Sequence, residues 1–233
     1  MSKLILALPS KGRLEELSRE VFGKAGMQIE RAGGARSYAG SMPSLSNVIV
    51  RFLPASEIAK ELIKGSIDVG ITGTDLIHET IEDGAKSVEI AIELGFGKAN
   101  AVIAIPDVWI DVTHVRDLAD VASDFREKHG RWLKIATKYI HLTRDFFAAN
   151  GIAQYKIVQS VGATEAAPSS GAADLIVDIT STGSTLKANG LRILDDGVIL
   201  KSQACIIVSK TAKWDKEKQE LKQKIVDAIS TIL

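Results

Sequence analysis

The stretch from residue 174 to 191, DLIVDITSTGSTLKANGL, constrains the fold of this chain more than any other. Its short apolar run, residues 175–177, contains β-branched side chains and is typical of a strand that is covered on both faces of a sheet. The small and hydroxyl-bearing residues that follow predict a turn out of the sheet, and residues 186–189 predict the start of a helix. Such a strand, turn and helix form a unit of an α/β fold with mainly parallel strands.

The turn inside this stretch has the composition of a phosphate-binding loop. Small side chains let backbone N–H groups converge on an anion, and the start of a helix adds partial positive charge. We expect the phosphate contacts to come from Ser181, Thr182, Gly183, Ser184 and Thr185. A plain capped connection explains the same spacing about equally well, and the Walker motif GxxxxGK[ST] is absent.

Asp178, near the end of the predicted strand, favours the phosphate interpretation. A carboxylate repels an inorganic anion, whereas it accepts hydrogen bonds from the hydroxyl groups of a phosphorylated sugar. The sequence therefore predicts a sugar-phosphate site, in which Asp178 binds ribose hydroxyls and the loop holds the phosphate. For Asp174, at the other end of the strand, we expect a structural role.

Composition limits the classes of protein and partner. The 233 residues carry 29 basic and 29 acidic side chains, so we expect no long-range attraction to nucleic acid or to an anionic membrane. Cys205 is the only cysteine, which excludes an intrachain disulfide and favours a reducing, cytoplasmic compartment. No stretch is long enough to span a bilayer, and the apolar run at residues 4–8 is too short for a signal sequence.

Further candidate contacts follow other predicted strands. Lys11, Gly12 and Arg13 come directly after the first strand, at the edge where open α/β sheets bind ligands. Taken alone, these residues favour two solvated basic side chains and no ligand. A second strand exit, GITGTDLI, repeats the pattern of glycines and hydroxyls around Gly73, and ATKY places Thr137 at a third strand end.

Three more segments complete the interpretation. Residues 31–47 are rich in Gly and Ser and predict a surface loop, from which Arg36 is able to close over a phosphate. Residues 191–194 and 198–208, around the turn DDG, predict a hairpin. The apolar spacing of residues 214–232 predicts an amphipathic helix that packs on its own lobe.

Several separated motifs resemble the short form of the ATP phosphoribosyltransferase family. They are LALPSKGRL, KIATKYIHLT, SVGATEAAPSSGAA and DLIVDITSTGSTLKANGL, which follow the family's order from the N-terminus to about residue 210. The resemblance implies an α/β fold of the two-lobe, periplasmic-binding-protein type II kind, with the active site in the interdomain cleft. We expect lobe I at residues 1–94 and 191–210, lobe II at 95–190, and a C-terminal helix at 211–233.

The reaction that this resemblance implies joins ATP and 5-phosphoribosyl 1-pyrophosphate. The products are N1-(5-phosphoribosyl)-ATP and pyrophosphate, in the first step of histidine biosynthesis, and Mg²⁺ enters bound to the pyrophosphate substrate. In this interpretation Asp178 and Glu165 act at the ribose, and residues 181–185 hold its 5-phosphate. The expected ATP contacts are Lys11, Gly12, Arg13, Arg36, Gly73 and Thr137.

The resemblance also implies a homodimer or larger assembly with a separate regulatory subunit similar to histidyl-tRNA synthetase. Long-form members carry a histidine-binding domain where this sequence has one predicted helix after Lys210. Two alternatives remain open. A two-lobe binding module should carry an export signal or a helix-turn-helix segment, and a nucleobase-salvage phosphoribosyltransferase usually has two adjacent carboxylates before its loop, whereas Ile179 follows Asp178 here.

The sequence departs from the commoner family pattern in three places, which are Pro54, Ala99–Asn100 and Ile140–His141. Many members have an arginine at the first of these positions. Arg51 is a candidate to replace it, although strand alternation is equally able to turn its side chain away.

Overall fold

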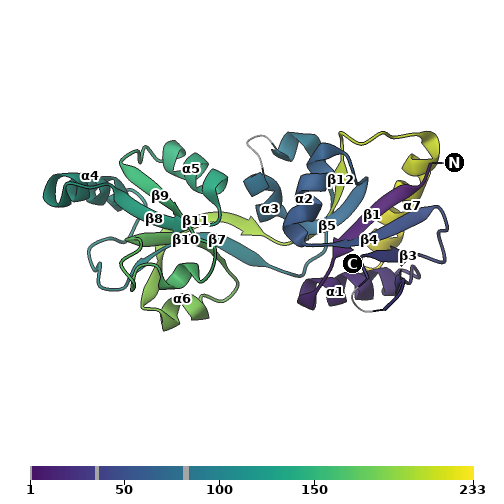
Figure 1. Ribbon diagram of the computed structural model, residues 1–233, viewed down its shortest axis with the longest axis horizontal. Helices are drawn as coiled ribbons and strands as arrows, with labels where there is room; N and C mark the ends of the chain where they lie inside the picture. Colours follow the sequence, from purple (N-terminus) through teal and green to yellow (C-terminus); the bar gives the residue numbers. More distant parts are fainter. Residues whose placement is uncertain (1, 35–36, 81–83) are drawn as a thin grey trace. The chain divides into compact units, whose positions relative to one another are not determined.

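The computed structural model describes residues 2–34, 37–80 and 84–233 of the chain. Its contacts divide the chain into two units (Figure 1): unit 1 comprises Met1–Gly97 and Gln203–Leu233, and unit 2 comprises Lys98–Ser202. Each unit has its own sheet with helices on both faces, which is the α/β architecture that the sequence predicts.

The sheet of unit 1 contains seven strands among the described residues. Their order across the sheet is β2 (Glu30–Arg31), β3 (Ala39–Ser41), β4 (Val48–Leu53), β1 (Leu4–Pro9), β5 (Val69–Gly73), β12 (Ala204–Ser209) and β6 (Val88–Glu93). β1 runs parallel to both β4 and β5, and the outer strand pairs are antiparallel. The carboxyl ends of β4, β1 and β5 therefore share one edge.

Helices cover both faces of this sheet because its central strands are apolar on both sides. The helices are α1 (Gly12–Lys24) and α7 (Lys216–Ser230) on one face, and α2 (Ala55–Lys64) and α3 (Thr74–Thr80) on the other, with a short 3₁₀ turn at Gly84–Ser87. Leu6 packs with Phe22 of α1, whereas Ala7 packs with Ile58 of α2. The alternation of β1 thus builds one core on each side.

The C-terminal helix α7 packs on unit 1, as its apolar spacing predicts. Ile225 and Ile229 are fully buried in the same core as Leu6. Asp215 caps the helix by accepting a hydrogen bond from the Lys218 N–H at 2.9 Å. The Lys218 ammonium in turn forms a buried ion pair with Asp68 at 2.8 Å, which fixes the helix against the start of β5.

The sheet of unit 2 has five strands. Their order is β11 (Leu191–Ser202), β7 (Ala99–Pro106), β10 (Leu175–Thr180), β8 (Leu133–Thr137) and β9 (Tyr155–Gln159). β10, β8 and β9 are parallel, and β7 is antiparallel to both of its neighbours. Helices α4 (Asp117–His129) and α5 (Ile140–Ala149) cover one face, while α6 (Ser184–Ala188) covers the other and a 3₁₀ turn at Thr164–Ala166 follows β9.

The predicted hairpin after Gly190 is wrong. The segment from Leu191 to Ser202 is one long strand, β11, and the turn signal DDG falls inside it. Register shifts against β7 absorb the extra residues, and the Asp196 carboxylate accepts a hydrogen bond from the Val115 N–H at 2.7 Å. Because β11 pairs with β7, residues 191–202 belong to unit 2, and the chain returns to unit 1 later than the expected boundary.

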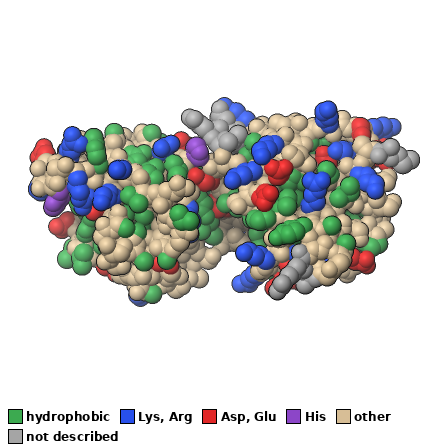
Figure 2. Space-filling model, in the orientation of Figure 1, with side chains coloured by type: hydrophobic (Ala, Val, Ile, Leu, Met, Phe, Trp, Pro, Cys, Tyr) green, Lys and Arg blue, Asp and Glu red, His purple; other side chains and the backbone are tan. Residues whose placement is uncertain are grey.

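The surface carries both signs of charge. Figure 2 shows Lys and Arg side chains interspersed with Asp and Glu on the face that it presents, in keeping with the equal counts in the sequence. Among the described residues, no helix combines the length and the apolar character that a bilayer crossing requires.

Candidate functional site

The predicted phosphate loop lies where the central strand β10 leaves the sheet of unit 2. Gly183 has a φ of +72°, in the left-handed region, and stands directly before α6. Its N–H donates to the Thr180 hydroxyl at 2.9 Å, and the hydroxyls of Thr182 and Ser184 lie 2.9 Å apart. These bonds hold a tight turn whose hydroxyl-bearing side chains, Ser181, Thr182, Ser184 and Thr185, are exposed.

Three parallel strands end at the same edge as this loop. The register pairs Val177 of β10 with Thr137 of β8, and Thr137 with Gln159 of β9. The exits of the three strands are therefore neighbours within unit 2. They carry the loop and Asp178 from β10, Lys138 from β8, and the turn with Glu165 from β9.

Asp178 is half-buried on the face of the sheet that α6 covers, since Ile176, two residues earlier, packs in the same core as Leu186 of α6. The Ile179 N–H donates to its Oδ1 at 2.9 Å. Burial raises the pKa of the Asp178 carboxyl above its usual value, and the charge of Glu165 adds to the rise. Burial removes part of the water around this carboxylate, so hydrogen bonds from a ligand would stabilise its charged form.

Glu165 is held close to Asp178 by the 3₁₀ turn after β9. Thr164, the first residue of that turn, is fully buried, and its hydroxyl donates to Ser160 Oγ at 3.0 Å. Thr164 and Lys138 both lower the pKa of Asp178, opposing the larger effect of burial. The structure therefore brings Asp178, Glu165 and residues 181–185 together at one edge.

Asp174, at the start of β10, has the structural role that we expect for it. Arg131 donates two hydrogen bonds to its carboxylate, at 2.6 and 2.7 Å, and the Lys134 N–H donates a third at 2.8 Å. Although burial alone would raise it, the pKa of Asp174 is lowered by Arg131 and by the Lys134 N–H. This carboxylate ties β10 to the start of β8.

Four of the predicted ATP contacts share one edge of unit 1. β1 ends at Pro9, Lys11 precedes α1, and Gly12 begins the helix with a φ of +74°. Lys11, Gly12 and Arg13 are exposed, and the β1–β5 register places Gly73 at the same edge. The α1 N-terminus has no side-chain cap.

The remaining candidates for ATP contacts are Thr137, Arg36 and Arg51. Thr137 belongs to unit 2, is fully buried, and its hydroxyl accepts a hydrogen bond from the Tyr139 N–H at 2.9 Å, which shapes the exit of β8. Arg36 lies outside the described residues. Arg51 is exposed in the middle of β4 and not at its carboxyl end.

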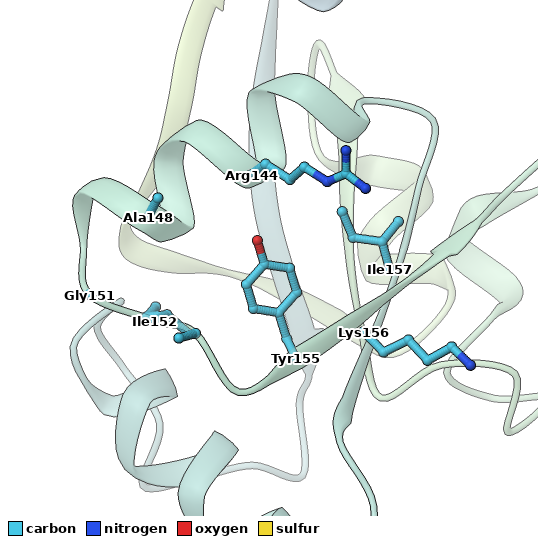
Figure 3. Close-up of a pocket in the computed structure, with 8 residues that line it drawn as sticks. Arg144, Ala148, Gly151, Ile152, Tyr155, Lys156 and Ile157 are labelled. Atoms are coloured by element: carbon cyan, nitrogen blue, oxygen red, sulfur yellow. The ribbon is translucent and has the colours of Figure 1, made fainter.

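A depression of about 650 Å³ also lies in unit 2, at the opposite edge of the sheet. It is bounded by α5 and by the first residues of β9, as Figure 3 shows. The hydroxyl of Tyr155 points toward α5, with the Arg144 side chain on the same helix, and Lys156 points away. Because Tyr155 begins β9, this depression is separate from the strand exits that carry the phosphate loop.

Sequence reasoning left Lys138 and Thr164 out of the site. The signal for both was their position next to a predicted site residue, since Lys138 comes after Thr137 in ATKY and Thr164 comes before Glu165 in GATEAA.

In the described part of the chain, no group of three or more His, Cys, Asp and Glu side chains is placed to hold a metal ion.

Comparisons with known proteins agree on one family. The family model described as ATP phosphoribosyltransferase matches residues 54–231. The ATP phosphoribosyltransferase of Bradyrhizobium sp. (strain ORS 278) is 54% identical over 226 residues, and that of Afipia carboxidovorans is 53% identical over 227. Each alignment covers 97% of this chain and 70% of the relative.

Solved structures give the same result for the fold. The "ATP phosphoribosyl transferase (HisG:HisZ) complex from Thermotoga maritima" aligns with a TM-score of 0.74 and 27% identity, over 98% of this chain and 97% of the other. The arginine-bound ArgBP from T. maritima aligns with a TM-score of 0.52 and 16% identity, over 100% and 97% of the two chains, which supports the periplasmic-binding-protein type of fold. The chain belongs to the ATP phosphoribosyltransferase family.

Proposed function

We propose that the edge of unit 2 formed by the exits of β8, β9 and β10 binds 5-phosphoribosyl 1-pyrophosphate. As a member of its family the chain is a pentosyltransferase, which joins this substrate to N1 of ATP in the first step of histidine biosynthesis. The observation that carries the proposal is the half-buried carboxylate of Asp178 on the same strand exit as the exposed hydroxyls of residues 181–185.

The reaction requires alignment of the two substrates and stabilisation of the charge that develops in the transition state, and it needs no side-chain nucleophile. Adenine N1 forms a bond to the anomeric carbon while the bond from that carbon to pyrophosphate breaks, and the electron pair leaves with pyrophosphate. Positive charge grows on the ribose ring in the transition state. Asp178, with Glu165 beside it, supplies negative charge there and accepts hydrogen bonds from the ribose hydroxyls.

Residues of the loop have two different roles, since one shapes the turn and the others contact the phosphate. The Gly183 N–H is bonded to Thr180, so we assign Gly183 to the shape of the turn. Contacts to the 5-phosphate then fall to the exposed Ser181, Thr182, Ser184 and Thr185, where hydroxyl and backbone N–H donors are available to an anion.

For ATP we propose the exposed edge of unit 1. Lys11 and Arg13 are cationic groups next to the glycine turn at Gly12, and Gly73 lies at the end of the neighbouring β5. Exposed cations suit a polyphosphate. Mg²⁺ arrives as a complex with the pyrophosphate and triphosphate oxygens of the substrates.

An absorbance assay tests this function. The full chain is mixed with ATP, 5-phosphoribosyl 1-pyrophosphate and Mg²⁺, and N1-(5-phosphoribosyl)-ATP is followed by its ultraviolet absorbance. We expect product that depends on both substrates. Product with a free nucleobase in place of ATP would favour a salvage enzyme, and tight binding without turnover would favour a binding module.

Regulation is the last part of the proposal. One solved relative is a HisG:HisZ complex. We therefore propose that this chain works in the cytoplasm as a homodimer or larger assembly with a separate regulatory subunit similar to histidyl-tRNA synthetase, which senses histidine. Titration of histidine into the assay should leave the isolated chain active and should inhibit it only in the presence of the partner. Strong inhibition of the isolated chain would contradict this idea.

A further inference from the structure

Lys138 is the first residue after β8, and the sheet register sets it beside Asp178. β10 and β8 pair Ile176 with Ala136 and Val177 with Thr137, so the next residues of the two strands stand at the same level. Neighbouring strands lie about 4.8 Å apart, and side chains at matched positions project from the same face. Asp178 and Lys138 therefore leave the sheet side by side.

The face that these two residues share is the one under α6. Ala136 and Ile176, two residues before each of them, are buried in the same core as Leu186 of α6. Alternation along a strand returns to the same face after two residues. Lys138 stands in the bend that follows β8, and from this exit its charge acts on Asp178.

Charged groups reach Asp178 from the exits of β8 and β9. The Lys138 ammonium and the Glu165 carboxylate act on it with opposite signs, and the Thr164 hydroxyl and the Ile179 N–H stabilise its charged form. On the other side, β7 sets the uncharged Val102 at this level, and the loop before α6 supplies hydroxyl-bearing residues and glycine. Lys138 is thus a cation that favours the ionised form of Asp178 and opposes the like charge of Glu165 on that carboxyl.

We propose that Lys138 is a positioning residue of the phosphoribosyl site, whose ammonium group balances Asp178 and Glu165 in the free protein and keeps Asp178 ready to receive the ribose hydroxyls. This inference rests on the function proposed above. Two other roles for an exposed lysine at this place have different consequences. A lysine that binds a substrate phosphate increases kcat/KM at every pH. A solvated lysine leaves kcat/KM unchanged at every pH.

The test is the pH profile of kcat/KM for 5-phosphoribosyl 1-pyrophosphate in Lys138→Met and Lys138→Arg. Because Lys138 favours the ionised form of Asp178, its removal raises the pKa of that carboxyl, and the acidic limb of the profile moves to higher pH. Above the limb, Lys138→Met should approach the wild-type value. Lys138→Arg, which keeps the charge, should retain the wild-type profile.

Lys134→Met is the matched control, since Lys134 lies on the same strand and its charge acts on Asp174 at the far end of β10. It should leave the acidic limb in place. An equal loss of kcat/KM at all pH values in Lys138→Met would overturn the proposal in favour of a phosphate contact, and an unchanged profile would overturn it in favour of a solvated lysine.

A second readout separates this inference from the proposed function. If the wild-type chain forms no product, the proposed function is refuted, whatever the result for the Lys138 variants. Carboxyl NMR of the substrate-free protein then still tests the inference, because Asp178 should titrate at higher pH in Lys138→Met than in the wild type. Identical titration of Asp178 in the two proteins would overturn the role of Lys138.

Discussion

Two aspartates stand at opposite ends of the central strand of unit 2, and their environments differ in kind. Asp174 receives three hydrogen bonds from Arg131 and the Lys134 backbone, and its pKa is lowered. Asp178 receives one backbone hydrogen bond, from Ile179, lies near the like charge of Glu165, and its pKa is raised. Hydrogen bonds from the protein stabilise the charge of Asp174, whereas we propose that the carboxylate of Asp178 gains its partners from a ligand.

This difference sets the sign of each group's contribution to stability. The lowered pKa of Asp174 adds stability above its unfolded pKa, and that stability is lost as the pH falls through the folded value. The raised pKa of Asp178 works in the opposite direction, because the folded state becomes less stable as the pH rises through that value. At neutral pH the ionised Asp178 therefore lowers the stability of the fold, at the residue that we propose for binding the ribose.

Asp178→Asn should have the largest effect on activity. Loss of the negative charge removes acceptor bonds and transition-state stabilisation at the ribose, so kcat/KM for 5-phosphoribosyl 1-pyrophosphate should fall by about 10²–10³-fold. Because asparagine mimics the neutral form that burial favours, the melting temperature at neutral pH should stay equal or rise. Steady-state kinetics and thermal unfolding check both parts, and a large loss of stability with normal kinetics would reverse the assignment.

Asp174→Asn should show the opposite pattern. Arg131 loses a charged partner, and since the Arg131 side chain is 41% exposed, the free energy of unfolding should fall by only about 1–2 kcal/mol. The kcat/KM of the folded protein should stay close to the wild-type value. The control is Asp124→Asn, which removes an exposed pair with Lys128 and should leave the stability nearly unchanged. Denaturant unfolding compares the three proteins.

Gly183→Ala sharpens the comparison at the loop. A Cβ at this position meets only Ile193, at 4.0 Å, so space is available and the cost is that of the left-handed φ of +72°, about 1 kcal/mol. We expect a modest loss of stability and a higher KM for 5-phosphoribosyl 1-pyrophosphate. Gly162→Ala is the control, since that glycine also has open space and its φ lies outside the left-handed region. Equal behaviour of the two variants would remove Gly183 from the loop's function.

Arg13→Ala extends the comparison to unit 1 and should have the smallest effect. Gly12 also begins a helix with a left-handed φ, yet the turn has no side-chain cap and its cations are exposed. We expect the KM for ATP to rise by about two- to fivefold with no change in melting temperature. A fall in melting temperature at unchanged KM would give Arg13 a structural role.

The sequence predicted those features that depend on local pattern. β10, the glycine turn and α6 form as their residue types require, and the family assignment is confirmed. The hairpin failed because DDG is a strong local turn signal, while pairing with β7 along residues 191–202 is a long-range property.

The site was predictable only in part. Asp178 and Glu165 lie in recognisable motifs, but their proximity, and that of Lys138, depends on the order β10, β8, β9 in the sheet. Periodicity does not reveal strand order. Thr137 stays a predicted ATP contact, although its hydroxyl is buried and accepts a hydrogen bond from the Tyr139 N–H.

Site-resolved carboxyl NMR of the full chain tests the central claim most directly. The resonances of Asp174 and Asp178 are assigned with the two Asn variants and followed as Mg²⁺ and 5-phosphoribosyl 1-pyrophosphate are added. We predict that, in the free protein, Asp178 titrates above and Asp174 below the usual range of an aspartate, and that only Asp178 responds to the substrate. A response at Asp174 with none at Asp178 would contradict the account.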